Sequence, residues 1–225
     1  GETGAGWARG VERLVELSPD SVTVYQMEVP GNTTLARALR AGEPLGGELA
    51  EVTTRRRWAD EAFRRLEEAG YRLTSGYTAV RGDVQQSFVY RDALWEGADL
   101  VPLGVSAFGH LGGAHVQNVK DLDVWLERAS TSTLWRGMVL TEDQRMIREV
   151  VLQLKRGEVD AERFRRRWGV ELAERFESAW ARLGGDVWRD GDRFVLSRAA
   201  LLRVDTLLPL FFEVEHGGLT LPEAA

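Results

Sequence analysis

Apolar residues recur at helical spacing twice in the first half of the chain, over residues 7–17 and 54–69, and this spacing predicts a helix in each place. Between them, residues 21–29 (SVTVYQMEV) alternate and are rich in β-branched side chains, which is typical of a strand. Residues 72–80 and 86–92 are further strand candidates. Because a strand without its neighbours exposes an edge, we expect the first strand to lie at an open edge with uncovered apolar side chains.

Helical patterns dominate from Thr141 onward. They predict helices over Glu142–Arg156, Ala161–Trp168 with Asp160 as its N-cap, Glu171–Leu183 and Ala199–Phe212. Before the last helix, DVWRDGDRFVL has the pattern of two short strands joined by a turn at Asp190-Gly191. Three helices followed by a hairpin predict a winged-helix-like module.

The change in pattern divides the chain into two expected domains, residues 1–130 and 131–225, with the boundary near Ser130–Leu140. A short helix is predicted over Lys120–Ala129. The segment before it, Gly104–Gly113, is rich in glycine and uncharged apart from one histidine, so one interpretation is a buried turn with Phe108 in the core.

The composition says little about the fold, but it limits the chemistry that the chain can perform. The 225 residues are 44% hydrophobic and 28% charged, and the formal net charge is -6, so nothing attracts the chain generally to nucleic acid or an anionic membrane. We find no apolar run long enough to span a bilayer, and we expect a cytoplasmic protein. With no cysteine, the chain offers no thiolate for a disulfide or an iron–sulfur cluster.

One segment carries a specific resemblance. GVSAFGHLGGAHVQN, residues 104–118, resembles a segment of the HemN-like radical SAM proteins, which include oxygen-independent coproporphyrinogen III oxidases. Four other segments resemble parts of that family in the same order: Gly1-Glu2-Thr3, VYQMEVPGNT (24–33), RRLEEAGY (64–71) and LRVDTLLPLFF (202–212).

The resemblance implies an α/β fold made of the last elements of a partial (β/α) radical SAM barrel, followed by a helical winged-helix-like C-terminal domain. It also implies a [4Fe–4S] cluster and S-adenosyl-L-methionine (SAM) in a longer parent, whose substrate is a tetrapyrrole or a related small molecule. The C-x-x-x-C-x-x-C loop that holds the cluster in the family is absent from this sequence. We therefore expect a C-terminal fragment that lacks the N-terminal barrel half, binds neither cofactor alone and cannot cleave SAM.

Site residues follow from the same resemblance. The positions that match SAM-contacting segments are Met27, Glu28, Val105, Ala107 and Phe108. Substrate-facing candidates are His110, His115, Gln117 and Asn118, while no catalytic residue is assigned. The amides of Gln117 and Asn118 could orient a substrate or satisfy loop backbone groups. Two histidines without a third ligand make a poor metal site, so we expect no metal.

Two alternatives concern charge. The arginines at 55–57 and at 163 and 165–167 could bind substrate carboxylates, but a solvated helix face paired with nearby acids is favoured. The winged-helix-like half could bind DNA or a protein partner on its own. Its candidate recognition helix, Glu171–Leu183, carries Glu171, Glu174 and Glu177 against two arginines, and this acidic excess disfavours nucleic acid.

Overall fold

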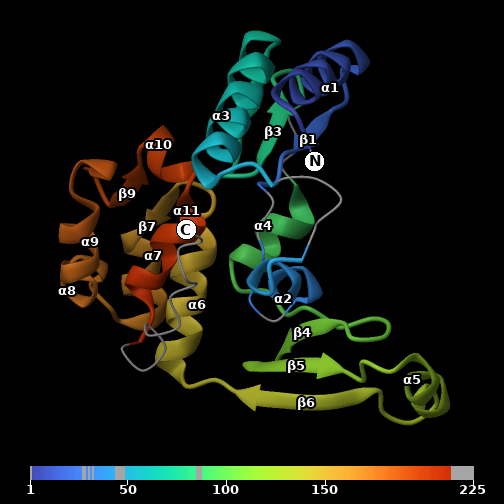
Figure 1. Cartoon of the computed structure of the whole chain (residues 1–225). Helices are drawn as coiled ribbons and strands as arrows, with labels where there is room; N and C mark the ends of the chain where they lie inside the picture. Colours follow the sequence, from blue (N-terminus) through green and yellow to red (C-terminus); the bar gives the residue numbers. More distant parts are fainter. Residues whose placement is uncertain are drawn as a thin grey trace.

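The computed structural model describes residues 2–26, 29, 31, 33–43, 49–84 and 88–213. Figure 1 shows three regions: a small α/β unit, a three-stranded sheet that extends to one side, and a mainly helical unit. Each contains one three-stranded sheet, in the orders β1-β3-β2, β4-β5-β6 and β7-β9-β8. Every pair in these sheets is antiparallel, so the described residues contain none of the parallel pairing of a barrel.

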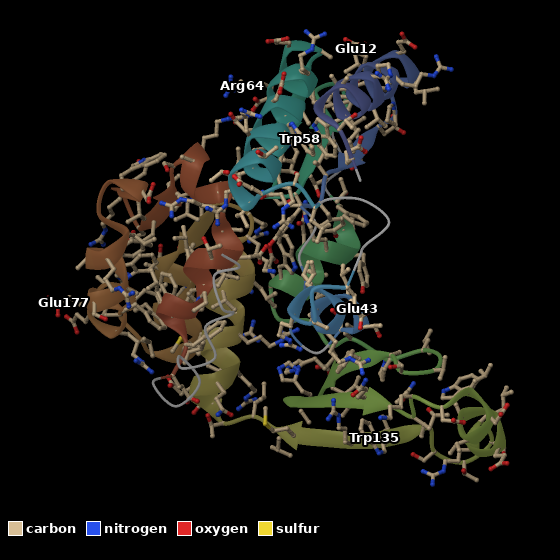
Figure 2. The ribbon with its side chains drawn as sticks, in the orientation of Figure 1. Glu12, Glu43, Trp58, Arg64, Trp135 and Glu177 are labelled. Carbon is tan, nitrogen blue, oxygen red and sulfur yellow. The ribbon has the colours of Figure 1, made fainter. Side chains whose placement is uncertain are left out.

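The first region packs two helices on its sheet. Its elements are α1 (Gly4–Leu17), β1 (Ser21–Thr23), α2 (Thr34–Arg40), α3 (Val52–Glu68), β2 (Tyr71–Leu73) and β3 (Thr78–Arg81). The core side of α3 presents Phe63 and Leu66, each 1% exposed, to the buried side chains of the sheet. Trp58 of α3 stacks on Trp7 of α1 at 6.1 Å between ring centroids (Figure 2). Both predicted helices are confirmed, while the single strand predicted over residues 72–80 is divided into β2 and β3, which pair with each other.

Two expectations for this region need correction. The first strand lies at an edge of its sheet as expected, but β1 is shorter than predicted. Val22 and Val24 are buried in a core shared with α3, whereas Tyr25 is 73% exposed. The strand predicted over residues 86–92 is wrong in its described part, where α4 (Val89–Trp95) forms instead. Arg91 and Trp95, four residues apart on this helix, are both buried, so tertiary packing outweighs the strand preference of Phe88-Val89-Tyr90.

The middle region is a sheet of three consecutive strands, β4 (Phe108–Leu111), β5 (Ala114–Asn118) and β6 (Leu134–Val139). Helix α5 (Leu122–Arg128) confirms the short helix predicted there and lies at the far end of the sheet (Figure 1). All six residues of β6 are exposed, including Trp135 (Figure 2). Since β6 pairs with β5, the sheet ends after the expected domain boundary at residue 130.

The last region begins with α6 (Glu142–Leu154), whose start is set by a capping box between Thr141 and Gln144. Asp160 caps α7 (Ala161–Trp168) by accepting from the Arg163 backbone N–H, as predicted. Strand β7 (Glu158–Asp160) joins the predicted hairpin, β8 (Val187–Asp190) and β9 (Arg193–Leu196), to form a small sheet. The core includes the fully buried Val150, Phe164 and Leu172.

Two single helices predicted in this region are divided in the structure. Residues 171–183 form α8 (Leu172–Arg175) and α9 (Glu177–Leu183), because Phe176 leaves helical geometry and packs on Phe211 at 5.3 Å. The last predicted helix becomes α10 (Arg198–Leu201), α11 (Val204–Leu207) and the 3₁₀ turn η2 (Leu208–Phe211). In both places core contacts override an uninterrupted apolar pattern. Gly184–Asp186 forms a further 3₁₀ turn, η1.

Long-range bonds join the first and last regions. Arg198 pairs with Asp60 and Glu67 on α3, and the Tyr77 hydroxyl donates to Asp205 at 2.6 Å. A Cβ on Gly76 would stand 2.6 Å from the Leu201 carbonyl oxygen, so the backbone approaches closely there. Among the described helices, none has the length and apolar character needed to cross a membrane.

Candidate functional site

The family-like segment 104–118 folds into a loop followed by the β4–β5 hairpin. Gly112 and Gly113 form its turn with φ of 55° and 80°. Two consecutive positive φ values suit a two-residue hairpin turn, and glycine adopts them without strain. The Gly-Gly pair between apolar residues was therefore an available hairpin signal, and the expectation of a simple buried turn over Gly104–Gly113 is wrong.

Gln117 and Asn118 hold the loop that precedes β4. The Asn118 amide donates to the carbonyl oxygens of Pro102 at 3.0 Å and Gly104 at 2.8 Å. Gln117 donates to Ser106 at 3.3 Å and accepts from Arg136 at 2.9 Å. Both side chains are buried, so their amides satisfy loop backbone groups, which is one of the two expected roles. Their contact with a substrate stays a prediction.

The expected SAM-contacting residues of this loop are at the surface. Phe108 is 67% exposed and Val105 is 39% exposed, while Ala107 is half-buried. The interpretation that places Phe108 in the core is therefore wrong. Met27 and Glu28 lie outside the described residues. Val105 and Phe108 are therefore accessible apolar side chains at the end of a loop that Asn118 holds through its bonds to Pro102 and Gly104.

His110 and His115 face each other across β4 and β5. Their Nδ1 atoms are 3.4 Å apart and the rings meet edge to face. Burial, followed by the positive charge of Arg148, lowers the pKa of His110 from 6.5 to about 4 and also lowers the pKa of His115. Both imidazoles are therefore neutral at pH 7. Within the described ranges no group of three or more His, Cys, Asp or Glu side chains could hold a metal.

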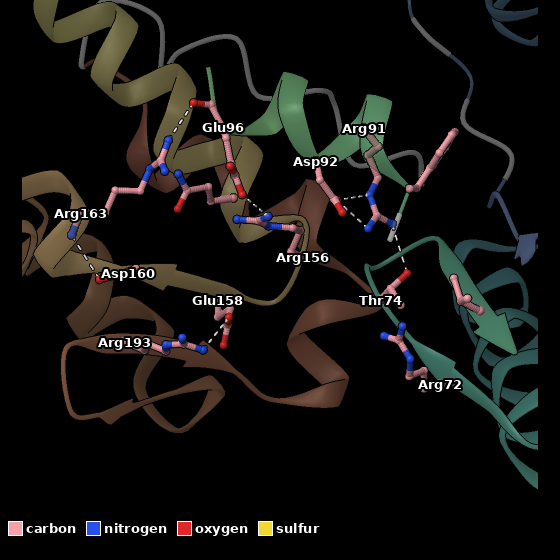
Figure 3. A pocket seen from close by; sticks show the side chains of 13 residues that line it. Arg72, Thr74, Arg91, Asp92, Glu96, Arg156, Glu158, Asp160, Arg163 and Arg193 are labelled. Atoms are coloured by element: carbon pink, nitrogen blue, oxygen red, sulfur yellow. Dashed lines mark hydrogen bonds and ion pairs between the residues drawn. The ribbon is translucent and has the colours of Figure 1, made fainter. Parts of the chain in front are cut away.

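A cleft of about 450 Å³, here called the larger cleft, lies between the first and last regions (Figure 3). Four of its arginines are in ion pairs: Arg91 with Asp92, Arg156 with Glu96, Arg163 with Glu149, and Arg193 with Glu158. Arg72, on the exposed side of β2, has no ion pair with a described residue.

A cleft of about 240 Å³, here called the smaller cleft, lies where the β4–β5 hairpin meets α6 and α7. Its lining comprises Gly97, Asp99, His110, Gly112, Gly113, Arg145, Arg148, Glu149, Arg167 and Trp168. The start of α6 is tied to the hairpin turn by a backbone bond from Leu140 to Gly113 at 2.9 Å. Sequence analysis missed Arg145 and Arg148, although their spacing on the predicted helix 142–156 places them on one face.

The arginine run at 163 and 165–167 is bound to acids, as favoured. Glu149, 1% exposed, accepts from Arg163 at 3.1 Å, Arg167 at 3.3 Å and the Trp168 indole at 3.3 Å. The other two arginines pair with Glu171 and Glu162.

Comparison with known proteins supports the resemblance. No family model matches the chain. The oxygen-independent coproporphyrinogen III oxidase of Salmonella typhimurium is 25% identical over 190 residues, which cover 78% of this chain and 40% of that protein. The protein of the same name from Pseudomonas aeruginosa is 26% identical and is matched over 91% of this chain and 44% of its own length. The chain thus spans less than half of these relatives, in their C-terminal part.

A solved structure, described as coproporphyrinogen III oxidase (HemN) from Escherichia coli, a radical SAM enzyme, matches with a TM-score of 0.73. The match covers 93% of this chain and 52% of that one at 22% identity, so it concerns the fold. The chain resembles the HemN-like radical SAM proteins, as the sequence predicts. Its mixed α/β fold is also as expected.

Proposed function

We propose that this chain forms the C-terminal part of a HemN-like radical SAM oxidoreductase that acts on a tetrapyrrole or a related small molecule. The observation that carries the proposal is the similarity over 78% of the chain to oxidases named for coproporphyrinogen III. The fold likeness to HemN and the family-like sequence of residues 104–118 support it. In this proposal, the chain up to β6 supplies the last barrel elements and the segment after them, and the region from α6 onward forms the C-terminal domain, so the boundary lies near residue 140 and not at 130.

The two cofactors of the family fit this chain differently. A [4Fe–4S] cluster needs thiolate ligands, and the sequence contains no cysteine, so the chain's residues do not fit the cluster. We therefore propose that the 225-residue chain alone takes up no cluster and does not cleave SAM.

The loop residues fit one face of SAM. An adenine ring requires a flat apolar wall, and Val105 and Phe108 offer exposed apolar side chains for it. In the complete protein, bound SAM would supply the chemistry that removes hydrogen from the substrate. The roles of this chain's residues are to form the wall and, through Gln117 and Asn118, to hold its backbone in place.

We also propose a winged-helix-like description for residues 141–213. Its support is the order of elements: helix α6, strand β7, helices α7 to α9, and the β8–β9 hairpin that pairs with β7. The acidic side chains at the start of α8 and α9 give no support to DNA binding.

Phe108→Ala tests the SAM wall in the protein expressed from the complete reading frame that contains this sequence. Loss of a large apolar contact worth about 1–3 kcal/mol predicts a ~5- to 150-fold rise in the SAM dissociation constant. Because Phe108 is 67% exposed, the melting temperature should stay unchanged. Cluster content should also stay unchanged, and both are measured on the same preparation.

Leu126→Ala is the matched control, since Leu126 is 57% exposed on α5, outside the loop. It should leave SAM affinity within about twofold of the original protein. An unchanged dissociation constant for Phe108→Ala would remove Phe108 from the SAM site. Failure of the complete protein to form 5′-deoxyadenosine from SAM under anaerobic reducing conditions would overturn the proposed function itself.

A further inference from the structure

The smaller cleft contains positive charge that its own acids do not neutralise. Arg145 and Arg148 stand one turn apart on α6, and neither forms an ion pair with any described residue. The Nε atom of Arg145 is buried and has no hydrogen-bond partner among the described atoms. Burial lowers the pKa of Arg148, and the nearby charges of Glu149 and Asp99 oppose this effect.

The acids that line the smaller cleft bind other partners and form no ion pair with Arg145 or Arg148. Glu149 already accepts from two other arginines and from the Trp168 indole. Both carboxylate oxygens of Asp99 accept from the Gly112 backbone N–H, at 3.2 Å each. His110 and His115 add no negative charge, since an imidazole is either neutral or positive.

An unpaired guanidinium in a partly buried wall is costly, because the charge loses water without gaining a counter-charge. A bound anion would remove this cost. The planar guanidinium forms parallel hydrogen bonds to the two oxygens of a carboxylate or a phosphate. Arg145 also lies 5.9 Å from the centre of the Trp168 ring, which restrains its position.

Size limits the ligand. At about 240 Å³ the smaller cleft falls below the roughly 300–1,000 Å³ of pockets for drug-sized ligands. Gly113 keeps the hairpin close to the cleft, since a Cβ there would stand 3.1 Å from the Arg145 side chain. The space therefore suits a small oxyanion or one carboxylate-bearing arm of a molecule.

We propose that the smaller cleft is an oxyanion-binding site in which Arg145 and Arg148 bind a carboxylate or a phosphate, and His110 and Trp168 form part of the wall around it. Val105, Ala107 and Phe108 do not line the smaller cleft, and the site does not depend on the proposed function. The ligand could be an organic acid or inorganic phosphate. Both present negatively charged oxygens to the two guanidinium groups, and the experiment below distinguishes them.

The test is isothermal titration of the 225-residue chain with succinate, with inorganic phosphate and with neutral succinamide, at constant ionic strength. We expect saturable binding of at least one anion and none of succinamide. Succinate alone would assign the site to carboxylates, phosphate alone to phosphate, and both to oxyanions in general. Absence of binding by either anion would overturn the proposal.

Variants locate the site. Arg145→Gln and Arg148→Gln should each weaken anion binding at least about tenfold, while Arg189→Gln, which removes an exposed charge from the distant β8–β9 hairpin, should change it less than about twofold. Circular dichroism checks that each variant folds. If Arg148→Gln unfolds, Arg148→Lys takes its place, because lysine keeps the positive charge but lacks the planar guanidinium. If the folded Arg145 and Arg148 variants bind the anion as tightly as the original protein does, the anion binds elsewhere and the proposed site is refuted.

Discussion

The larger and smaller clefts are both lined by arginines, yet their charges are balanced differently. In the larger cleft four of five arginines have a carboxylate partner, between 2.8 Å for Arg91–Asp92 and 3.1 Å for Arg163–Glu149. In the smaller cleft two of three arginines have none among the described residues. Counting arginines in the sequence cannot distinguish these cases, because the distinction depends on which acids each guanidinium reaches.

Glu149 lies between the two clefts and connects them. It lines the smaller cleft, and it binds Arg163, which lines the larger one. Because it is 1% exposed, it cannot exchange its partners for water. The difference between the clefts therefore suggests different uses: ion pairs hold the larger cleft together, while the smaller one retains charge for a ligand.

Among the substitutions that test the difference between the two clefts, Glu149→Ala should lower the free energy of unfolding most. It leaves Arg163, Arg167 and the Trp168 indole without their buried acceptor, and breaking a buried pair costs about 3–5 kcal/mol. Urea unfolding measures this loss. Glu158→Ala, which breaks a pair whose side chains are 55% and 44% exposed, is the control. Equal losses in both variants would show that burial does not separate these ion pairs.

The histidine pair makes stability depend on pH. The folded-state pKa of His110, about 4, lies below its usual 6.5, so the unfolded chain binds more protons as the pH falls. The free energy of unfolding should therefore decline between about pH 6.5 and pH 4 by at most about 3.5 kcal/mol, since one pKa unit corresponds to about 1.4 kcal/mol. Urea unfolding across this range checks it.

His110→Gln should flatten this pH dependence, because glutamine does not titrate. His115→Gln should reduce the slope less, because it leaves the buried His110 in place. A slope that stays the same in both variants would assign the effect to carboxylates elsewhere.

Arg193→Gln should have the smallest effect. Arg193 is 55% exposed and pairs with an exposed Glu158 across β9 and β7, and such pairs contribute about 0–1 kcal/mol. We expect a change in the free energy of unfolding within about 0.5 kcal/mol, measured by urea unfolding at low and high salt. A salt-sensitive loss above about 1 kcal/mol would show that the larger cleft acts as a coupled network.

Much of the fold was predictable because its signals are local. Helix α7 begins after its cap Asp160 as predicted, and the β8–β9 hairpin forms around Gly191. The Gly112-Gly113 hairpin was also predictable, but its signal was not used. Phe176 shows the limit: nothing in its neighbours' pattern ends a helix there, and its contact with Phe211 comes from a distant segment.

By itself, the sequence determined the HemN-like resemblance, the main helices and the absence of thiolate ligands, because motifs, periodicity and composition are properties of the chain alone. Only the tertiary structure decided that Phe108 is exposed, that His110 faces His115, and that Glu149 joins Arg163 and Arg167, while Arg145 and Arg148 form no ion pair with a described residue. Burial and charge pairing depend on distances between segments that the fold brings together, and electrostatic energy depends on those distances.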